Sequence, residues 1–296
     1  MSSWAELRSL AHAGKEADPV AYRMHRQLSI HITRLLLRTG VRPNAVTLCM
    51  LVVAAVGIAL MAAPGLAANA AGGALLYFGF LLDKVDGELA RCRHETSLRG
   101  ILLDRFHHRL VEPTLFAAAA AHATRHEASP GALVAAAACM LFANAIEEHQ
   151  QLAPYIVYKH VRAGGALPAT TVESLAMRRL ARWLRPLKAA RMHIVALPCL
   201  LIAYVAEAAS GRPVTRIYLE SSAVMLGVYL LFQCVDCASG RLEAEARDIA
   251  ATFVRAAAPP RPAPARQPNN PSMTSAVTAP TPRREDGRAQ TLKQEE

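Results

Sequence analysis

Long uncharged blocks alternate with shorter, basic connections along the chain. The longest uncharged run covers residues 43–82, and Pro64-Gly65 divides it into two parts that are each long enough to cross a bilayer as a helix. Because these blocks are continuously apolar rather than striped at helical spacing, they indicate membrane segments and not the helices of a water-soluble core. The pattern predicts an all-α bundle of six transmembrane helices, at about residues 45–63, 66–90, 98–121, 129–146, 192–206 and 221–235.

A basic amphipathic helix is expected before the first span, at residues 20–39. Its apolar and basic side chains recur at helical spacing on opposite sides, which is typical of a helix that lies on the membrane surface rather than across it. The apolar side holds Met24, Leu28, Ile32 and Leu35, and the basic side holds Arg23, Arg26 and Arg34.

The composition changes at both ends of the expected membrane domain. Residues 1–19 are polar and charged, and the chain after about residue 256 holds eight prolines and few large apolar residues. Such a composition cannot bury enough apolar surface to offset the entropy of ordering the chain. We therefore expect a polar N-terminal segment at residues 1–19, a membrane domain at residues 20–242 and a C-terminal extension at residues 243–296, disordered from about residue 256.

The net charge of +10 comes largely from Lys and Arg in the connections between the apolar blocks. No motif for reading bases or the phosphate backbone accompanies them, so we expect membrane lipids and not nucleic acid as the partner of this charge. Nineteen Lys and Arg flank the spans on the side of residues 83–99, against three on the opposite side. This asymmetry predicts that both termini and residues 83–99 are cytoplasmic. The Ala- and Arg-rich usage is associated with GC-rich bacterial genomes and favours a bacterial inner (plasma) membrane.

Carboxylates gather where the longest uncharged run meets water. On a helix, Asp83 and Asp86 are three residues apart and share one face, while Asp104 and His108 form an i, i+4 pair on the next helix. Carboxylates that converge at a membrane edge repel one another and are costly to desolvate unless a cation lies between them. Oxygen ligands suit Mg²⁺ or Mn²⁺ better than zinc. The spacing therefore predicts a divalent metal site at Asp83, Asp86 and Asp104.

Small residues and an arginine stand beside these acids. Gly87 and Gly100 allow backbone or ligand to approach closely where a side chain would block it. Arg91, one helical turn after Gly87, has the forked guanidinium that suits a bidentate contact with phosphate. Acids for a metal, an arginine for phosphate and glycines for access together indicate metal-assisted phosphoryl transfer with a lipid-soluble substrate.

The stretch from Asp83 to His108 resembles the signature of the CDP-alcohol phosphatidyltransferase family, D-x2-D-G-x2-A-R-x8-G-x3-D-x3-D. The last aspartate of the signature is replaced by His108 in this chain. Pro43-Asn44 with Thr47 is similar to the PNxxT that opens the family's first membrane helix, and the resemblance extends over about residues 20–242. Seven signature positions match at the required spacing: Asp83, Asp86, Gly87, Ala90, Arg91, Gly100 and Asp104.

This resemblance implies an enzyme of phospholipid biosynthesis that acts on a CDP-linked lipid such as CDP-diacylglycerol, or on a CDP-alcohol. A hydroxyl of an alcohol acceptor would attack the phosphorus next to the lipid or alcohol, and CMP would leave. Asp104 and His108 would be catalytic, with His108 as the general base. The resemblance also implies a homodimer, Mg²⁺ or Mn²⁺ at the three aspartates, and a nucleotide that contacts Asn44, Thr47, Gly87, Ala90, Arg91 and Gly100.

Two alternatives remain open from the sequence. The change from aspartate to His108 removes a negative charge and a hard oxygen ligand, so one alternative is a catalytically degenerate homologue that binds nucleotide or lipid without efficient turnover. A non-enzymatic helical membrane protein, such as a scaffold or a transporter, would instead line a path through the bilayer with its charges. The sequence does not identify the acceptor alcohol.

Overall fold

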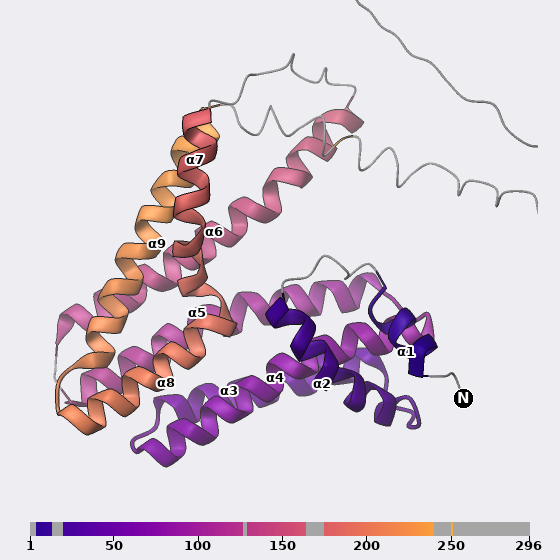
Figure 1. Ribbon diagram of the computed structural model, residues 1–296, viewed down its shortest axis with the longest axis horizontal. Coiled ribbons are helices and arrows are strands. Elements are labelled where there is room, and N and C mark those ends of the chain that lie inside the picture. The colour runs from indigo at the N-terminus through magenta and orange to yellow at the C-terminus, as the bar shows by residue number, and fades with distance from the viewer. Residues whose placement is uncertain (1–3, 14–19, 127–128, 164–174, 240–249, 251–296) are drawn as a thin grey trace, which may run out of the picture. The chain divides into compact units, whose positions relative to one another are not determined.

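The structure, a computed structural model of the chain, describes residues 4–13, 20–126, 129–163, 175–239 and 250. Within these residues all regular structure is helical, which confirms the predicted fold class. The predicted disorder from about residue 256 lies outside the described residues. The elements are α1 (Trp4–Ala11), α2 (Val20–Leu36), α3 (Pro43–Ala62), α4 (Leu66–Arg93), α5 (Leu98–His126), α6 (Pro130–Arg162), α7 (Leu175–Leu184), the 3-10 helix η1 (Arg185–Arg191), α8 (His193–Ser210) and α9 (Val214–Ala238), shown in Figure 1.

Among the described residues, five helices are long and apolar enough to cross a membrane: α3, α4, α6, α8 and α9. They correspond to the first, second, fourth, fifth and sixth predicted spans. The third predicted span forms as α5, a helix of 29 residues. Its first half carries Arg99, Asp104, Arg105, Arg109 and Glu112, so it lacks the apolar composition of the others. Length and composition thus support five spans, and the sixth stays a prediction.

α3 and α4 form a tight antiparallel hairpin because small residues line their contact (Figure 1). A Cβ added to Gly72 would lie 2.7 Å from the carbonyl oxygen of Gly57, so the two backbones approach too closely for a side chain at this point. Asn69 Nδ2 donates to the carbonyl oxygens of Met61 and Ala63, each at 2.9 Å, and these hydrogen bonds stabilise the turn between α3 and α4. This pairing brings the start of α3 beside the end of α4.

Alanine fills much of the contact among α5, α6, α8 and α9, which supply most of the largest buried cluster. Small side chains let helices pack closely inside a bilayer, where dispersion contacts rather than the hydrophobic effect hold them together. The close contact between α5 and α6 fixes the charged half of α5 against the polar section of α6. The buried alanines that these two helices contribute to the cluster are Ala118, Ala119, Ala120 and Ala123 of α5 and Ala132, Ala135, Ala136 and Ala143 of α6.

A helix, α2, forms where the sequence predicts the N-terminal amphipathic helix, and it packs on α4 through polar contacts. Ser29 Oγ and Thr33 Oγ1 each donate at 2.7 Å to the fully buried carboxylate of Glu88 on α4. The apolar side chains of Met24 and Leu28 are exposed on the protein surface. This outward apolar side fits a helix at the membrane surface, and its position there stays a prediction.

The N-terminal segment, expected only to be polar, contains a helix that packs on the membrane domain. α1 buries Leu7 and Ala11 completely or nearly so, against Ile30 of α2 and the partly buried Cys92 of α4. α1 therefore lies beside the last turns of α4, where the signature residues are concentrated. The domain boundary at residue 20 stays a prediction.

Candidate active site

A polar pocket of about 380 Å³ lies where the start of α3, the end of α4 and the start of α5 meet. Every residue that the sequence predicts to contact nucleotide, metal or the reacting groups lines this pocket. The structure therefore brings these residues together from three helices, and the role of each stays a prediction. They are Asn44 and Thr47 of α3, Asp83, Asp86, Gly87, Ala90 and Arg91 of α4, and Gly100, Asp104 and His108 of α5.

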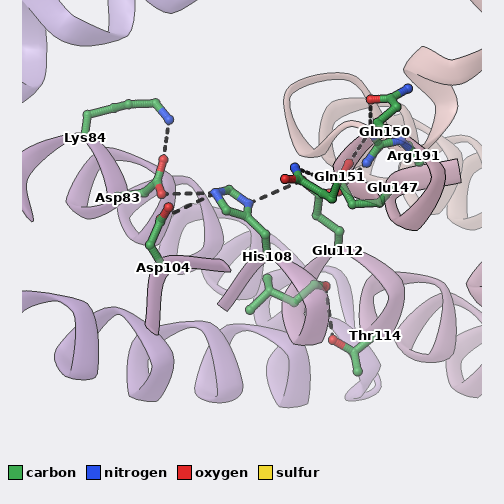
Figure 2. Close-up of polar contacts among 11 residues, drawn as sticks. Asp83, Lys84, Asp104, His108, Glu112, Thr114, Glu147, Gln150, Gln151 and Arg191 are labelled. Carbon is green, nitrogen blue, oxygen red and sulfur yellow. Dashed lines mark hydrogen bonds and ion pairs between the residues drawn. The ribbon is translucent and has the colours of Figure 1, made fainter. Parts of the chain in front are cut away.

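Asp83, Asp104 and His108 form a compact group, shown in Figure 2. One ligand atom from each lies within 4.8 Å of the others. His108 Nε2 is 3.2 Å from Asp83 Oδ1 and 3.7 Å from Asp104 Oδ1. Lys84 Nζ pairs with the second oxygen of Asp83. Because the Asp83 side chain is only 4% exposed, its charge depends on these neighbours and on any cation that binds.

Asp86 lines the same pocket one turn further along α4, and α3 fixes its carboxylate. Thr47 Oγ1 donates to Asp86 Oδ2 at 2.7 Å, and both residues are buried. The structure thus brings Asp83 and Asp104 to one point and places Asp86 beside them, bonded to the threonine of the PNxxT segment. A hydrogen bond to an ionised carboxylate is stronger than one between neutral groups, so this contact fixes the register of α3 against α4.

The two signature glycines leave room for neighbouring side chains of the site. A Cβ added to Gly100 would lie 3.0 Å from Asn44 Oδ1, so a side chain at this position would displace the asparagine. A Cβ added to Gly87 would lie 3.3 Å from Arg91 Nη1. The predicted role of both glycines was access for backbone or ligand. Their surroundings show that they also accommodate Asn44 and Arg91.

Arg91 is held by α1. Its Nε donates to the carbonyl oxygen of Ala11 at 2.8 Å, and Arg26 of α2 lines the same end of the pocket. Burial lowers the pKa of His12, and the charges of Arg26, Arg91 and Arg8 lower this pKa further. These arginines concentrate positive charge at this end of the pocket, which suits a phosphate group, and the buried Glu88, 3.8 Å from Arg26 Nη1, offsets part of it.

A series of polar contacts leads from His108 away from the pocket (Figure 2). His108 Nδ1 is 3.4 Å from Glu112 Oε1, and Glu112 Oε2 accepts a hydrogen bond from Arg191 Nη1 at 3.1 Å. Arg191 Nη2 is 2.6 Å from Glu147 Oε2. The imidazole of His108 therefore faces carboxylates at both of its ring nitrogens.

Reasoning from the sequence missed several residues of this site, among them Lys84, Arg26, Glu112 and Ala11. Glu112 follows His108 at i+4 on α5, a spacing that could have identified it. Arg26 was assigned to the polar side of a surface helix, yet its side chain is buried. Ala11 contributes a backbone carbonyl, which no pattern of side chains can reveal.

The donor set of the pocket fits a divalent cation. Asp83 and Asp104 present carboxylate oxygens to one point, and oxygen is the ligand that Mg²⁺ and Mn²⁺ prefer. Two carboxylates this close repel each other unless positive charge lies between them. Lys84 pairs with Asp83, and His108 Nε2 lies within 3.7 Å of both carboxylates.

Comparison with known proteins decides the family. The sequence profile of the CDP-alcohol phosphatidyltransferase family matches residues 40–240, more than half of the chain. The chain belongs to this family. It is a transferase of phospholipid synthesis that moves a phosphatidyl or substituted phosphate group from a CDP-linked donor to an alcohol and releases CMP. Members of the family depend on a divalent metal ion.

Two crystal structures of phosphatidylinositol phosphate synthase PgsA1 from Mycobacterium tuberculosis resemble this chain. The structure with CDP-DAG bound aligns with a TM-score of 0.47 and 20% sequence identity, covering 69% of this chain and 90% of that one. The structure in complex with manganese and citrate aligns with a TM-score of 0.44 and 19% identity, covering 69% and 85%. No curated protein matches the chain significantly by sequence.

Proposed function

We propose that this CDP-alcohol phosphatidyltransferase takes CDP-diacylglycerol as its donor and transfers the phosphatidyl group to a hydroxyl of an acceptor alcohol in the pocket between α3, α4 and α5. The single observation that carries the proposal is that all ten residues predicted from the sequence line one polar pocket. Signature residues that served only helix packing would not be expected to converge on a shared cavity of about 380 Å³.

Asp83 and Asp104, with Asp86 beside them, would hold Mg²⁺ or Mn²⁺. The buried position of Asp83 and its closeness to Asp104 support this assignment, since both features call for a cation. A divalent ion bound there offsets negative charge on the diphosphate and on the departing CMP.

The remaining residues of the pocket would bind the donor. Arg91, with Arg26 beside it, would contact a phosphate of the diphosphate through charge-assisted hydrogen bonds. Asn44 and Thr47 would lie toward the cytidine, because both are on α3 and face the last turns of α4. The cytidine and ribose would fit against Gly87, Ala90 and Gly100, where side chains are small or absent.

His108 would move the proton in this reaction. The acceptor oxygen forms a bond to the phosphorus next to the diacylglycerol, the bond from that phosphorus to the CMP oxygen breaks, and CMP leaves. The hydroxyl proton passes to His108 Nε2, the ring atom on the side of Asp83 and Asp104. Asp104, one helical turn from His108, stabilises the imidazolium that results.

The arrangement in the membrane follows from the same charges. α5 would be the sixth span, with its charged half facing the interior of the bundle, as the contacts of Glu112 and Arg109 with α6 and η1 support. The pocket and both termini would be cytoplasmic in a bacterial inner (plasma) membrane, with α2 on the lipid surface. The catalytic unit would be residues 20–242, and the enzyme would act as a homodimer.

Purified protein in detergent micelles tests the proposal. The protein is incubated with cytidine-labelled CDP-diacylglycerol, with Mg²⁺ or Mn²⁺, and with a panel of acceptors that includes glycerol phosphate, inositol, inositol phosphate and serine. CMP release that depends on one acceptor and is abolished by a chelator is expected. Binding of the labelled nucleotide without CMP release for any acceptor would instead support the degenerate homologue. If CDP-choline or CDP-ethanolamine reacts in place of the lipid donor, the proposed donor is wrong.

A further inference from the structure

The ring of His108 is contacted from two opposite sides. Nε2 is 3.2 Å from Asp83 Oδ1 on the pocket side, and Nδ1 is 3.4 Å from Glu112 Oε1 on the other (Figure 2). An imidazole that hydrogen-bonds through one nitrogen presents the other in a defined direction, because the bond fixes both the tautomer and the ring rotation. The direction of the His108 ring is therefore set from both sides, by Asp83 at Nε2 and by Glu112 at Nδ1.

Glu112 is itself held firmly. Its second oxygen, Oε2, accepts from Arg191 Nη1 at 3.1 Å, and the Arg191 side chain is only 9% exposed. The other end of this guanidinium contacts Glu147 Oε2 at 2.6 Å and Gln150 Oε1 at 3.4 Å, both on α6. Three elements, α5, α6 and η1, thus fix the carboxylate that faces His108. Without these contacts, the Glu112 side chain would be free to change rotamer.

We infer that Glu112 is a positioning residue for His108: it holds Nδ1 and thereby keeps Nε2 turned toward Asp83, Asp104 and the pocket. The inference rests on the proposed role of His108 in the reaction. It goes further because it links Glu112 to the replacement of the last signature aspartate by His108. An imidazole offers a donor to Glu112, whereas the aspartate of the family signature offers only acceptor oxygens when ionised. Aspartate at position 108 would gain nothing from Glu112 and would be repelled by it.

This coupling predicts that the effect of Glu112 depends on the residue at position 108. Glu112→Gln keeps the size of the side chain and removes its charge. In the enzyme with His108, we expect this variant to lower kcat about 10–100-fold, as loss of a residue that orients a reactive group does, with little change in the KM for CDP-diacylglycerol. In the His108→Asp background, the same change should leave kcat unchanged or raise it.

The two backgrounds separate positioning from a purely structural role. Glu112→Gln also removes an ion pair with Arg191, and a loss of packing from that source would lower kcat by the same factor in both backgrounds. An equal loss in both would therefore overturn the inference. Glu220→Gln is the matched control, because it breaks another i, i+4 ion pair, with Arg216 on α9, beside Gly131 at the start of α6. It should leave kcat unchanged.

A second measurement tests the inference without relying on activity. If the parent enzyme releases no CMP, that result counts against the proposed function alone, and the inference can still be tested. Thermal unfolding in detergent is compared for the parent protein, His108→Ala, Glu112→Ala and the double variant. Shifts in Tm that are clearly less than additive show that the two side chains hold each other, as the inference requires. Additive shifts would show that they do not, and the inference would fail whatever the activity.

Discussion

Thr47 Oγ1 donates a hydrogen bond of 2.7 Å to Asp86 Oδ2, and this bond joins the PNxxT segment of α3 to the first half of the signature on α4. Both side chains are buried, so water cannot replace the donor if it is removed. The hydroxyl therefore has two effects. It orients one of the three predicted metal ligands, and it supplies a hydrogen-bond donor to that buried carboxylate.

Thr47→Val should impair the enzyme, whereas Thr47→Ser should not. Valine has nearly the same shape but cannot donate, and loss of a hydrogen bond to a charged group costs about 1.5–3 kcal/mol. This corresponds to a fall of roughly ten- to a hundredfold in kcat/KM, measured as CMP release. Serine retains the hydroxyl and should stay within about threefold of the parent. An equal loss in Thr47→Ser, which retains the hydroxyl, would show that this hydrogen bond does not account for the effect.

His108→Ala should lose much more activity than His108→Asp. Removing a general base typically lowers the rate by about 10²–10⁴-fold, whereas aspartate restores the residue that the family signature carries and can still accept a proton. The measurement is kcat for CMP release at saturating donor and acceptor. Unaltered activity in His108→Ala would remove this residue from the mechanism and leave the carboxylates of Asp83 and Asp104 to be examined as the base.

Gly72→Ala should destabilise the fold, and Gly79→Ala on the same helix is its control. A methyl group on Gly72 would lie 2.7 Å from backbone atoms of α3, at the Gly57 oxygen and the Met61 nitrogen, which cannot move aside as a side chain can. Overpacking of this kind costs about 1–3 kcal/mol. A methyl on Gly79 would meet only Val53, at 3.9 Å.

Alanine is favoured over glycine inside a helix by about 1 kcal/mol, so Gly79→Ala should be neutral or stabilising. Thermal unfolding of the two variants in the same detergent measures the difference. If Gly72→Ala unfolds at the parent temperature, α3 and α4 are not packed as closely as the described contact requires.

Leu7→Ala should raise the KM for CDP-diacylglycerol severalfold, through Arg91. Leu7 is 5% exposed and anchors α1, whose last residue, Ala11, accepts the hydrogen bond from Arg91 Nε. Truncating a buried leucine costs about 2–5 kcal/mol, which is large for a helix of eight residues. Leu10→Ala, in the same helix but 43% exposed, is the control and should leave KM unchanged. If both variants have the parent KM, α1 does not hold Arg91 for the donor.

The helix faces that carry the candidate site residues could be predicted from the sequence because they depend on spacing along single helices. Asp83 with Asp86 and Asp104 with His108 share helix faces whatever the rest of the fold does, since three or four residues make one turn. The uncharged blocks predicted five of the spans for a similarly local reason: about twenty apolar residues in a row have few other stable solutions. The cost of leaving these acids without a cation added the expectation that the two faces meet, and in the structure their residues line one pocket.

Contacts between segments far apart in the chain could not be predicted from the sequence. The amino acids alone specified all-helical structure, the candidate ligands and the replacement of the last signature aspartate by His108. Three contacts became visible only with the helices packed together: a carbonyl of α1 holds Arg91, Glu112 faces His108, and Arg191 fixes Glu112. The physical reason is that spacing along a helix determines which side chains share a face, whereas the partner that this face meets is set by close packing of several helices at once.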